Sequence, residues 1–458
     1  MKRFIGDKAF YKAVLVIFLP VILQNFVTTF VNLLDNMMVG QLGTMQFSGV
    51  SIVNNLITVY NLVLFGTMAA VGIFSAQYAG SGDHKGVRQC VHLKLFAGLL
   101  IFLIGLAVFK CFGTPLISLY LDESTNTAAE IAETLTSALQ YLQIMLIGLC
   151  PFAFSQSMSS TLRENGDTFL PMIGSVSAVI VNFVFNYLLI FGHFGFPRLG
   201  VQGAAIATVL SRFVELGVLL TGTFARKAKY GFMNADVPFL YIPFELIRKV
   251  IVQGSPLVLN ELLYSVITAT VVQCYSTRGL TAVAAVNITQ TITHLFTIAV
   301  YGMGQSISIM VGHALGAGDH ETARAYDRQL IALSVTLCTI LGVIMFMVSP
   351  AIPAIYNTSA EVKELACSLL RISACMLPVQ AVYIGCYMTL RSGGKTVLTL
   401  AFDSGSLLLL SLPVAYCLSH FTALPIFFVY LFVTLCDVPK GILGLTLVAK
   451  GIWVNTIV

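Results

Sequence analysis

Five acidic side chains lie inside long apolar stretches of the sequence; they are Asp35, Glu215, Glu261, Asp403 and Asp437. Asp35 stands in the run VNLLDNMMVG, and the apolar stretch before it, residues 14–31, carries no charge. An aspartate at the centre of a lipid-spanning helix costs roughly 2.5–3.5 kcal/mol on insertion scales. A carboxyl kept at such a cost can bind a cation or carry a proton, so these residues are the first candidates for function.

The composition places these carboxylates in a membrane protein. Of the 458 residues, 57% are hydrophobic and 10% are charged, whereas about a quarter of a soluble domain is charged. The net charge of +5 is modest and does not indicate a nucleic-acid partner. Ten cysteines are scattered without a C-x-x-C pair, which favours small core residues over a disulfide framework or a metal site.

Apolar stretches long enough to cross a bilayer recur along the whole chain. We place twelve spans at residues 13–39, 48–77, 91–112, 136–160, 169–192, 200–224, 250–276, 284–313, 329–352, 366–390, 396–418 and 424–449. A polar segment divides the chain near its middle. We therefore expect an N-terminal lobe over residues 1–225, a cytoplasmic linker over 226–249 and a C-terminal lobe over 250–458.

The two halves of the chain repeat. GSGDHKGVR at 80–88 matches GAGDHETAR at 316–324 at an offset of 236, and TLRENGDT at 161–168 matches TLRSGGKT at 389–396 at an offset of 228. Six spans in each half keep both halves in the same orientation. The predicted fold is therefore an all-α integral membrane protein, with two six-helix lobes related by a parallel repeat about a pseudo-two-fold axis normal to the membrane.

The basic residues predict how the chain is oriented. With the N-terminus inside, 18 of the 25 Lys and Arg residues fall on the inner side and five on the outer side. Cytoplasmic loops carry the excess of basic residues in membrane proteins. We expect a multi-pass protein of the cell membrane with both termini in the cytoplasm.

Four polar side chains of the first half are predicted to reach one depth. Asp35 lies in the outer half of the first span. Asn182 and Asn186 are four residues apart and share a face of the fifth span, and Thr208 lies about two turns into the sixth. Their oxygens suit Na⁺, and a carboxylate alone suits a proton. We predict a cation-coupling site here; the alternative is a hydrogen-bonded core cluster.

The acidic residues of the second half do not follow the repeat. Glu261 matches Asn25, and Asp403 matches Ser175. Because scaffold residues repeat and acidic ones do not, we expect the two halves to have specialised roles. The candidates for coupling or substrate binding in the second half are Glu261, Gln290, Asp403 and Asp437.

Two of the five acidic residues have a basic residue close by on the same span. Glu215 follows Arg212 by three residues, and Asp437 precedes Lys440 by three. Residues at this spacing are neighbours on a helix surface. A structural ion pair is the better interpretation for Glu215, while for Asp437 an ion pair and a functional role both stay open.

The chain resembles the multidrug and toxic compound extrusion (MATE) transporters, and the DinF-like branch more than the NorM branch. The resemblance rests on LPVILQNFVTTFVNLLDNMMVGQLG at 19–43, NFVFNYLLIFG at 182–192, GVQGAAIATVLSR at 200–212 and the doubled TLR motifs. It covers essentially the whole chain. It implies a two-lobed antiporter of twelve helices that exports organic, often cationic, amphiphiles in exchange for H⁺ or Na⁺.

The resemblance also implies roles for individual residues. In the DinF-like branch an aspartate follows a proline by fifteen residues, a spacing that Asp35 and Pro20 fit. Because a proline removes a backbone hydrogen bond, Pro20 is the predicted hinge of the first span. The branch also uses the positions of Asn182, Asn186 and Thr208, although Asn186 stands where an aspartate often stands. In the NorM branch Glu261 matches, and Gln380 stands where its aspartate partner is expected.

Together these observations predict a cation-coupled multidrug antiporter with Asp35 as the coupling carboxylate. With one carboxylate in the first-half cluster we favour H⁺, while Na⁺ at Asp35, Asn182, Asn186 and Thr208 stays open. We expect small cationic amphiphiles as substrates, a monomer in the bilayer, no cofactor and no enzymatic activity, because no catalytic or nucleotide-binding motif occurs. The rival hypothesis is a flippase for lipid-linked precursors or polysaccharides, which calls for more basic residues in the spans.

Overall fold

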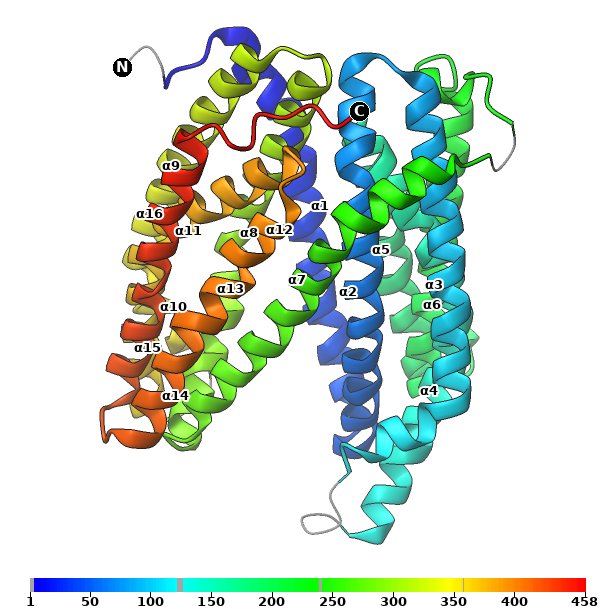
Figure 1. Ribbon diagram of the computed structural model, residues 1–458. Coiled ribbons are helices and arrows are strands. Elements are labelled where there is room, and N and C mark those ends of the chain that lie inside the picture. The colour runs from blue at the N-terminus through cyan, green and yellow to red at the C-terminus, as the bar shows by residue number, and fades with distance from the viewer. Residues whose placement is uncertain (1–3, 122–126, 239–240, 357) are drawn as a thin grey trace. The chain divides into compact units, whose positions relative to one another are not determined.

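The computed structural model describes residues 4–121, 127–238, 241–356 and 358–458 (Figure 1). Within these ranges all regular structure is helical, and twelve helices are long and apolar enough to cross a membrane. The predicted all-α class and the number of spans are confirmed. Helices satisfy their own backbone hydrogen bonds, so they are a stable way for an apolar chain to cross lipid.

The first ten spans are single helices: α1 (Lys8–Gly40), α2 (Thr44–Ser81), α3 (His84–Ser118), α4 (Ala128–Glu164), α5 (Phe169–Phe191), α6 (Val201–Ala225), α7 (Phe244–Ser276), α8 (Leu280–Gly316), α9 (His320–Val348) and α11 (Ala360–Ser392). The last two spans consist of α12 (Thr396–Phe402), α13 (Ser404–Ser406), the π-helical η3 (Leu407–Ser411), α14 (Leu412–Phe421), α15 (Ile426–Leu435) and α16 (Asp437–Ala449). The short elements between spans are η1 (His193–Gly195), η2 (Gly231–Met233) and α10 (Ala351–Ile355).

The helices depart from the predicted spans in three places. The ninth span was expected to reach residue 352, but α9 ends at Val348, just before Pro350, whose ring lacks an amide hydrogen. The eleventh span is interrupted at Asp403 and continues through a π-helical turn. The twelfth is interrupted at Cys436. The helix α1, by contrast, is continuous through Pro20.

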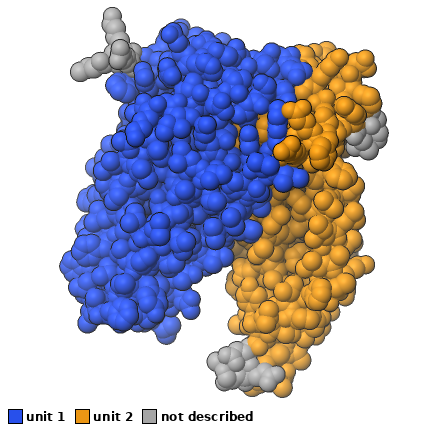
Figure 2. Space-filling view, in the orientation of Figure 1, with its two compact units in different colours: residues 1–22, 76–83, 249–458 blue, residues 23–75, 84–248 orange. Residues whose placement is uncertain are grey.

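By its internal contacts the chain forms two compact units (Figure 2). Unit 1 comprises residues 1–22, 76–83 and 249–458, and unit 2 comprises residues 23–75 and 84–248. The start of α1 and the end of α2 thus belong to unit 1, whereas most of both helices belongs to unit 2. The lobe boundaries expected from the sequence, 1–225 and 250–458, remain a prediction.

Unit 2 is built on α6, which packs against α4 and α5, while α3 packs against α4. Its core holds fully buried apolar side chains from several helices, among them Val53, Leu64, Ile190 and Ala205. Small residues let these helices come close together. A Cβ atom at Gly203 on α6 would lie 2.5 Å from the carbonyl oxygen of Leu189 on α5, so this contact between α5 and α6 requires glycine.

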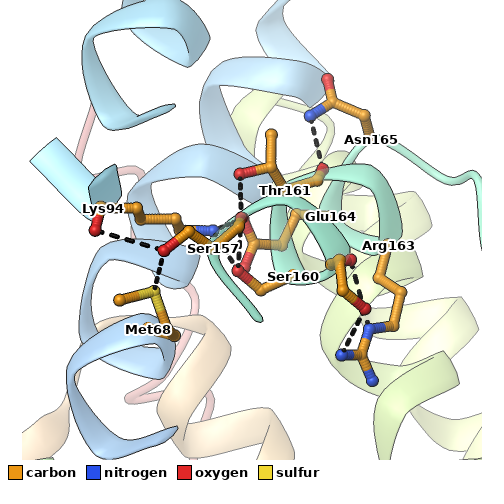
Figure 3. Close-up of polar contacts among 9 residues, drawn as sticks. Met68, Lys94, Ser157, Ser160, Thr161, Arg163, Glu164 and Asn165 are labelled. Atoms are coloured by element: carbon orange, nitrogen blue, oxygen red, sulfur yellow. Dashed lines mark hydrogen bonds and ion pairs between the residues drawn. The ribbon is translucent and has the colours of Figure 1, made fainter. Parts of the chain in front are cut away.

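A buried ion pair ties α2, α3 and α4 together within unit 2 (Figure 3). Lys94 is fully buried, contacts the Glu164 carboxylate and donates a hydrogen bond to Ser160 Oγ at 3.0 Å. Gly72 on α2 packs on the same carboxylate, since a Cβ there would lie 2.5 Å from Glu164 Oε1. Both charges are compensated internally, so this pair serves packing.

In unit 1, α11 packs against α8, α9 and α16. Fully buried residues such as Ile307, Leu330, Ala381 and Leu390 form its main core. The single tryptophan of the chain, Trp453, is 1% exposed and belongs to this core, directly after α16. A second cluster joins α7, α8, α11, α14 and α15.

The polar segment after α6 is held to unit 2 by several contacts. Lys229 Nζ lies 2.5 Å from Asp167 Oδ2, and the Tyr230 hydroxyl donates to the same oxygen at 2.7 Å. Arg88 Nη1 donates to the carbonyl oxygens of Met233 and Ala235 at 3.0 and 2.9 Å. Burial alone would raise the pKa of the Asp167 carboxyl. The hydrogen bonds from Lys229 and Tyr230 instead hold this pKa below its ordinary value.

Candidate functional site

The four residues predicted for cation coupling come together in unit 2. The amide Nδ2 of Asn186 donates to Asp35 Oδ1 at 2.5 Å and to Asn182 Oδ1 at 3.2 Å. Asn182 Nδ2 in turn donates to Thr208 Oγ1 at 3.2 Å. A single chain of hydrogen bonds therefore runs from the carboxylate on α1, through two amides on α5, to the hydroxyl on α6. We call these four residues the Asp35 cluster.

Local sequence explains how the Asp35 cluster forms. Asn182 and Asn186 lie one helical turn apart on α5, so their side chains point to one side. The close contact at Gly203 brings α6 against that part of the chain, which lets Thr208 reach Asn182. Asn186 itself is fully buried, and no hydrogen-bond partner for its Oδ1 is found among the described residues.

The Asp35 carboxylate has no ion-pair partner in the part of the chain that the structure describes. Ion pairs in that part of the chain join other carboxylates, with Lys94, Arg212, Lys229 and Lys440 among their basic partners. Asp35 is half-buried, and a carboxylate removed from water without a basic partner favours its neutral form or binds a cation. The arrangement can therefore take up and release a cation.

Tyr141 is a neighbour of the cluster that the sequence did not reveal. It is 2% exposed on α4, and its hydroxyl donates to Asn54 Oδ1 at 3.3 Å. It also lies close to Asp35 and Thr208. A lone tyrosine in an apolar helix has no distinctive spacing. The only available signal was Asn54, a polar residue of the second span.

The acidic candidates of the second half are placed differently. Asp403 Oδ1 lies 2.6 Å from Lys440 Nζ, and Asp403 Oδ2 accepts a hydrogen bond from Asn260 Nδ2 at 2.9 Å. The sequence left open a pair between Lys440 and Asp437; the ion pair that forms is with Asp403 instead. Packing of α12 beside α16 brings Asp403 to the lysine, although 37 residues separate them.

The remaining candidates do not join this ion pair. Glu261, next to Asn260 on α7, lies close to Tyr387 and Arg391. Gln290 lies half-buried on α8, with no side-chain hydrogen bond to the described residues. The expected pair of Glu215 with Arg212 forms at 3.5 Å.

Both halves of the sequence match one known family. The profile of the MatE family matches residues 20–188 and 256–417, and so covers both halves. The chain belongs to the MatE family. It is therefore a multi-pass membrane protein of a transporter family and not an enzyme.

Curated relatives of this MatE protein are moderately similar over most of their length. One from Thermotoga maritima, named "Probable multidrug resistance protein NorM", is 27% identical over 405 residues, which covers 87% of this chain and 83% of the relative. Another of the same name, from Listeria innocua, is 25% identical and covers 92% of this chain and 90% of the relative. The resemblance to the DinF-like branch stays a prediction.

Solved structures share the fold of this MatE protein. A transporter of the MOP superfamily from Pyrococcus furiosus superimposes with a TM-score of 0.83 at 20% identity, covering 98% of this chain and 97% of the other. A MATE transporter from Vibrio cholerae gives a TM-score of 0.86 at 18% identity and covers 97% of both chains. At this level of identity the likeness extends to the fold.

Proposed function

We propose that this protein is a cation-coupled multidrug antiporter that exports cationic or amphiphilic organic compounds by alternating access, with Asp35 as the coupling carboxylate. One observation carries the proposal. Asp35 is held by an asparagine at 2.5 Å and has no ion-pair partner among the described residues. The names of the curated relatives support the multidrug part of the proposal.

The proposed coupling ion is H⁺. Asn186 turns its NH₂ group, and not its oxygen, toward Asp35. A Na⁺ ion beside Asp35 would need oxygen ligands on that side, whereas a proton needs the carboxylate alone. The cluster also holds a single carboxylate; a Na⁺ site can be built from one carboxylate and amide oxygens, but it is weaker than a site with a second negative charge. These two features favour a cycle in which Asp35 gains and loses a proton.

The proposed substrates are cationic or zwitterionic amphiphiles. Three of the five acidic residues that the sequence places within spans, Asp35, Glu261 and Asp437, have no ion-pair partner among the described residues. An excess of negative charge over positive charge in a transport pathway attracts organic cations and disfavours anionic lipid-linked sugars. We therefore favour drug export over the flippase hypothesis.

The proposed location is the cell membrane, with both termini in the cytoplasm. The protein would act as a monomer, because one chain supplies every residue of the Asp35 cluster. Cysteine variants test the orientation. A thiol introduced by Phe196→Cys, between α5 and α6, should react with an impermeant reagent from outside, whereas Asn234→Cys should not. The reverse labelling, measured against the unsubstituted protein, would overturn this topology.

Transport in proteoliposomes tests the coupling. Purified protein should move a cationic dye against its gradient when a pH gradient is imposed, without Na⁺. A Na⁺ gradient at equal pH should not drive transport. Transport driven by Na⁺ alone would make Asp35 a Na⁺ ligand instead. Movement of lipid-linked sugars, with no dye transport under either gradient, would favour the flippase.

A further inference from the structure

The Asp403–Lys440 pair lies deep inside unit 1. The Lys440 side chain is 3% exposed and Asp403 is 9% exposed. The ammonium nitrogen lies 2.6 Å from Asp403 Oδ1, a short ionic hydrogen bond. Two aromatic rings also face the ammonium, since Nζ lies 4.3 Å from the centre of the Tyr383 ring and 5.7 Å from that of Phe402. Such rings attract a cation through their π faces.

The other carboxylate oxygen is also engaged. Asp403 Oδ2 accepts a hydrogen bond from Asn260 Nδ2 at 2.9 Å. Asn260 is fixed in turn, because its Oδ1 accepts from the hydroxyl of Ser404 at 2.7 Å and from the Ser404 amide at 3.2 Å. The carboxylate is therefore held in one orientation, with its remaining oxygen aimed at the lysine.

The backbone departs from regular helix at this carboxylate. The helix α12 ends at Phe402, Asp403 has φ −86° and ψ −77°, and the π-helical η3 follows four residues later. The repeat counterpart of Asp403 is Ser175, which lies inside the uninterrupted α5. Interrupted helices in membrane proteins occur where backbone or side chains hold ions. Here the groups around the interruption surround the ammonium of Lys440.

We propose that Lys440 is a covalently attached cation, which permanently occupies a monovalent-cation site formed by Asp403, Tyr383 and Phe402 in unit 1. A tethered ammonium neutralises the carboxylate but cannot leave the site. Asp403 thus takes no part in ion exchange. The inference rests on the proposed antiport function in one respect: it removes Asp403 from the carboxylates that could exchange an ion, in keeping with the role proposed for Asp35.

Removing the tether tests the proposal directly. Lys440→Ala removes the last three carbons and the ammonium of the side chain. The free ion n-propylammonium has the same three carbons and the same charge. We would introduce it together with Asp35→Asn, so that the Asp35 cluster does not contribute an ion response. At pH 8, n-propylammonium chloride should raise the unfolding temperature of this variant toward that of the Asp35→Asn parent. Choline chloride at equal ionic strength should not, because its quaternary head group is too large and cannot donate a hydrogen bond to Asp403.

The fluorescence of Trp453 provides a second readout, since this single tryptophan follows α16, which carries Lys440. It should respond to n-propylammonium with the same concentration dependence as the unfolding temperature. The matched control adds Asp403→Asn to Lys440→Ala, which removes the negative charge. That control should respond to neither salt.

Two outcomes would overturn the proposal. In the first, the Lys440→Ala protein responds to n-propylammonium no more than the control with Asp403→Asn, so that the lysine is only a structural partner. In the second, it fails to fold at any amine concentration while the control folds, so that the site cannot accept a free cation. Because the test measures binding in an Asp35→Asn background, failure of proton-coupled transport at Asp35 would leave its result unaffected.

Discussion

The two units hold a carboxylate inside their helices in different ways. In unit 2, Asp35 accepts a hydrogen bond from a neutral amide and has no ion-pair partner among the described residues. In unit 1, Asp403 is bound to a lysine at 2.6 Å. Removing one partner of a buried ion pair leaves an uncompensated charge, whereas a carboxyl beside an amide can become neutral by protonation. The arrangement at Asp35 is suited to binding and releasing a cation, whereas the arrangement at Asp403 is suited to holding the lysine permanently.

The repeat makes this difference informative. At an offset of 236 Asp35 corresponds to Val271, a core residue of unit 1 that is 9% exposed. At the same offset Gln24 corresponds to Asn260, and the two amides make matching bonds. Gln24 Nε2 donates to Ser175 Oγ at 2.8 Å, as Asn260 donates to Asp403. The scaffold contact repeats while the charge it supports does not.

Asp35→Asn should have the largest effect on transport. An amide keeps the size and the hydrogen-bonding ability of the side chain but cannot release a proton. We expect uphill export in proteoliposomes to be abolished while dye binding, measured by equilibrium titration, is retained. A variant that still concentrates dye under a pH gradient would show that coupling lies elsewhere.

Asp403→Asn should act on stability instead. It leaves the Lys440 ammonium buried without a counter-charge, which destabilises the fold by roughly 3–5 kcal/mol. Thermal unfolding in detergent should show this loss, and adding Lys440→Met should restore most of the stability. If the single variant is fully stable but loses its response to the pH gradient, Asp403 has the exchanging role that we assign to Asp35.

Asn186→Asp should sharpen the contrast by giving unit 2 a second carboxylate beside the first. Two carboxylates in contact hold more negative charge than one proton balances, which strengthens binding of a metal cation. We expect dye export by this variant to become stimulated by a Na⁺ gradient. Asn182→Asp, one turn away and not bonded to Asp35, serves as the control with a smaller response.

The smallest effect concerns the polar segment after α6, which Asp167 holds. In the sequence repeat, Asp167 corresponds to Lys395 in unit 1. Asp167→Lys imposes the unit 1 residue and should speed tryptic cleavage near Arg226 and Lys227. Because Lys229 is 58% exposed, losing its ion pair with Asp167 should lower the stability of the attached segment by about 1 kcal/mol or less. Tyr230→Phe, which removes one of the hydrogen bonds to Asp167, should have a weaker effect. Unchanged cleavage in both variants would mean that Arg88 suffices to hold the segment.

The pH dependence of this anchor follows from the lowered pKa of Asp167. A carboxyl whose pKa is lower in the folded state stabilises the structure above its unfolded value, and this stability is lost as the pH falls through the folded value. Hydrogen exchange of residues 226–238 should therefore show constant protection between about pH 5 and 8. Protection should fall only in stronger acid, and a loss near pH 6 would contradict the assignment.

The sequence alone determined the membrane class, the twelve spans and the membership of the Asp35 cluster. Hydropathy is a one-dimensional property, because lipid requires each span to be apolar along its own length. The cluster was predictable for a related reason. Asn182 and Asn186 share a helix face by spacing, and depth along each span set the height of Asp35 and Thr208.

Tertiary structure decided which charged groups meet. Spacing places Asp437 near Lys440 on one helix, but packing of α12 against α16 presents Asp403 to the lysine instead. Tyr141 and the interruption at Asp403 likewise have no signature in spacing or hydropathy. A buried charge pairs with the group that reaches it with the best geometry in three dimensions, and contacts between helices distant in sequence set that geometry.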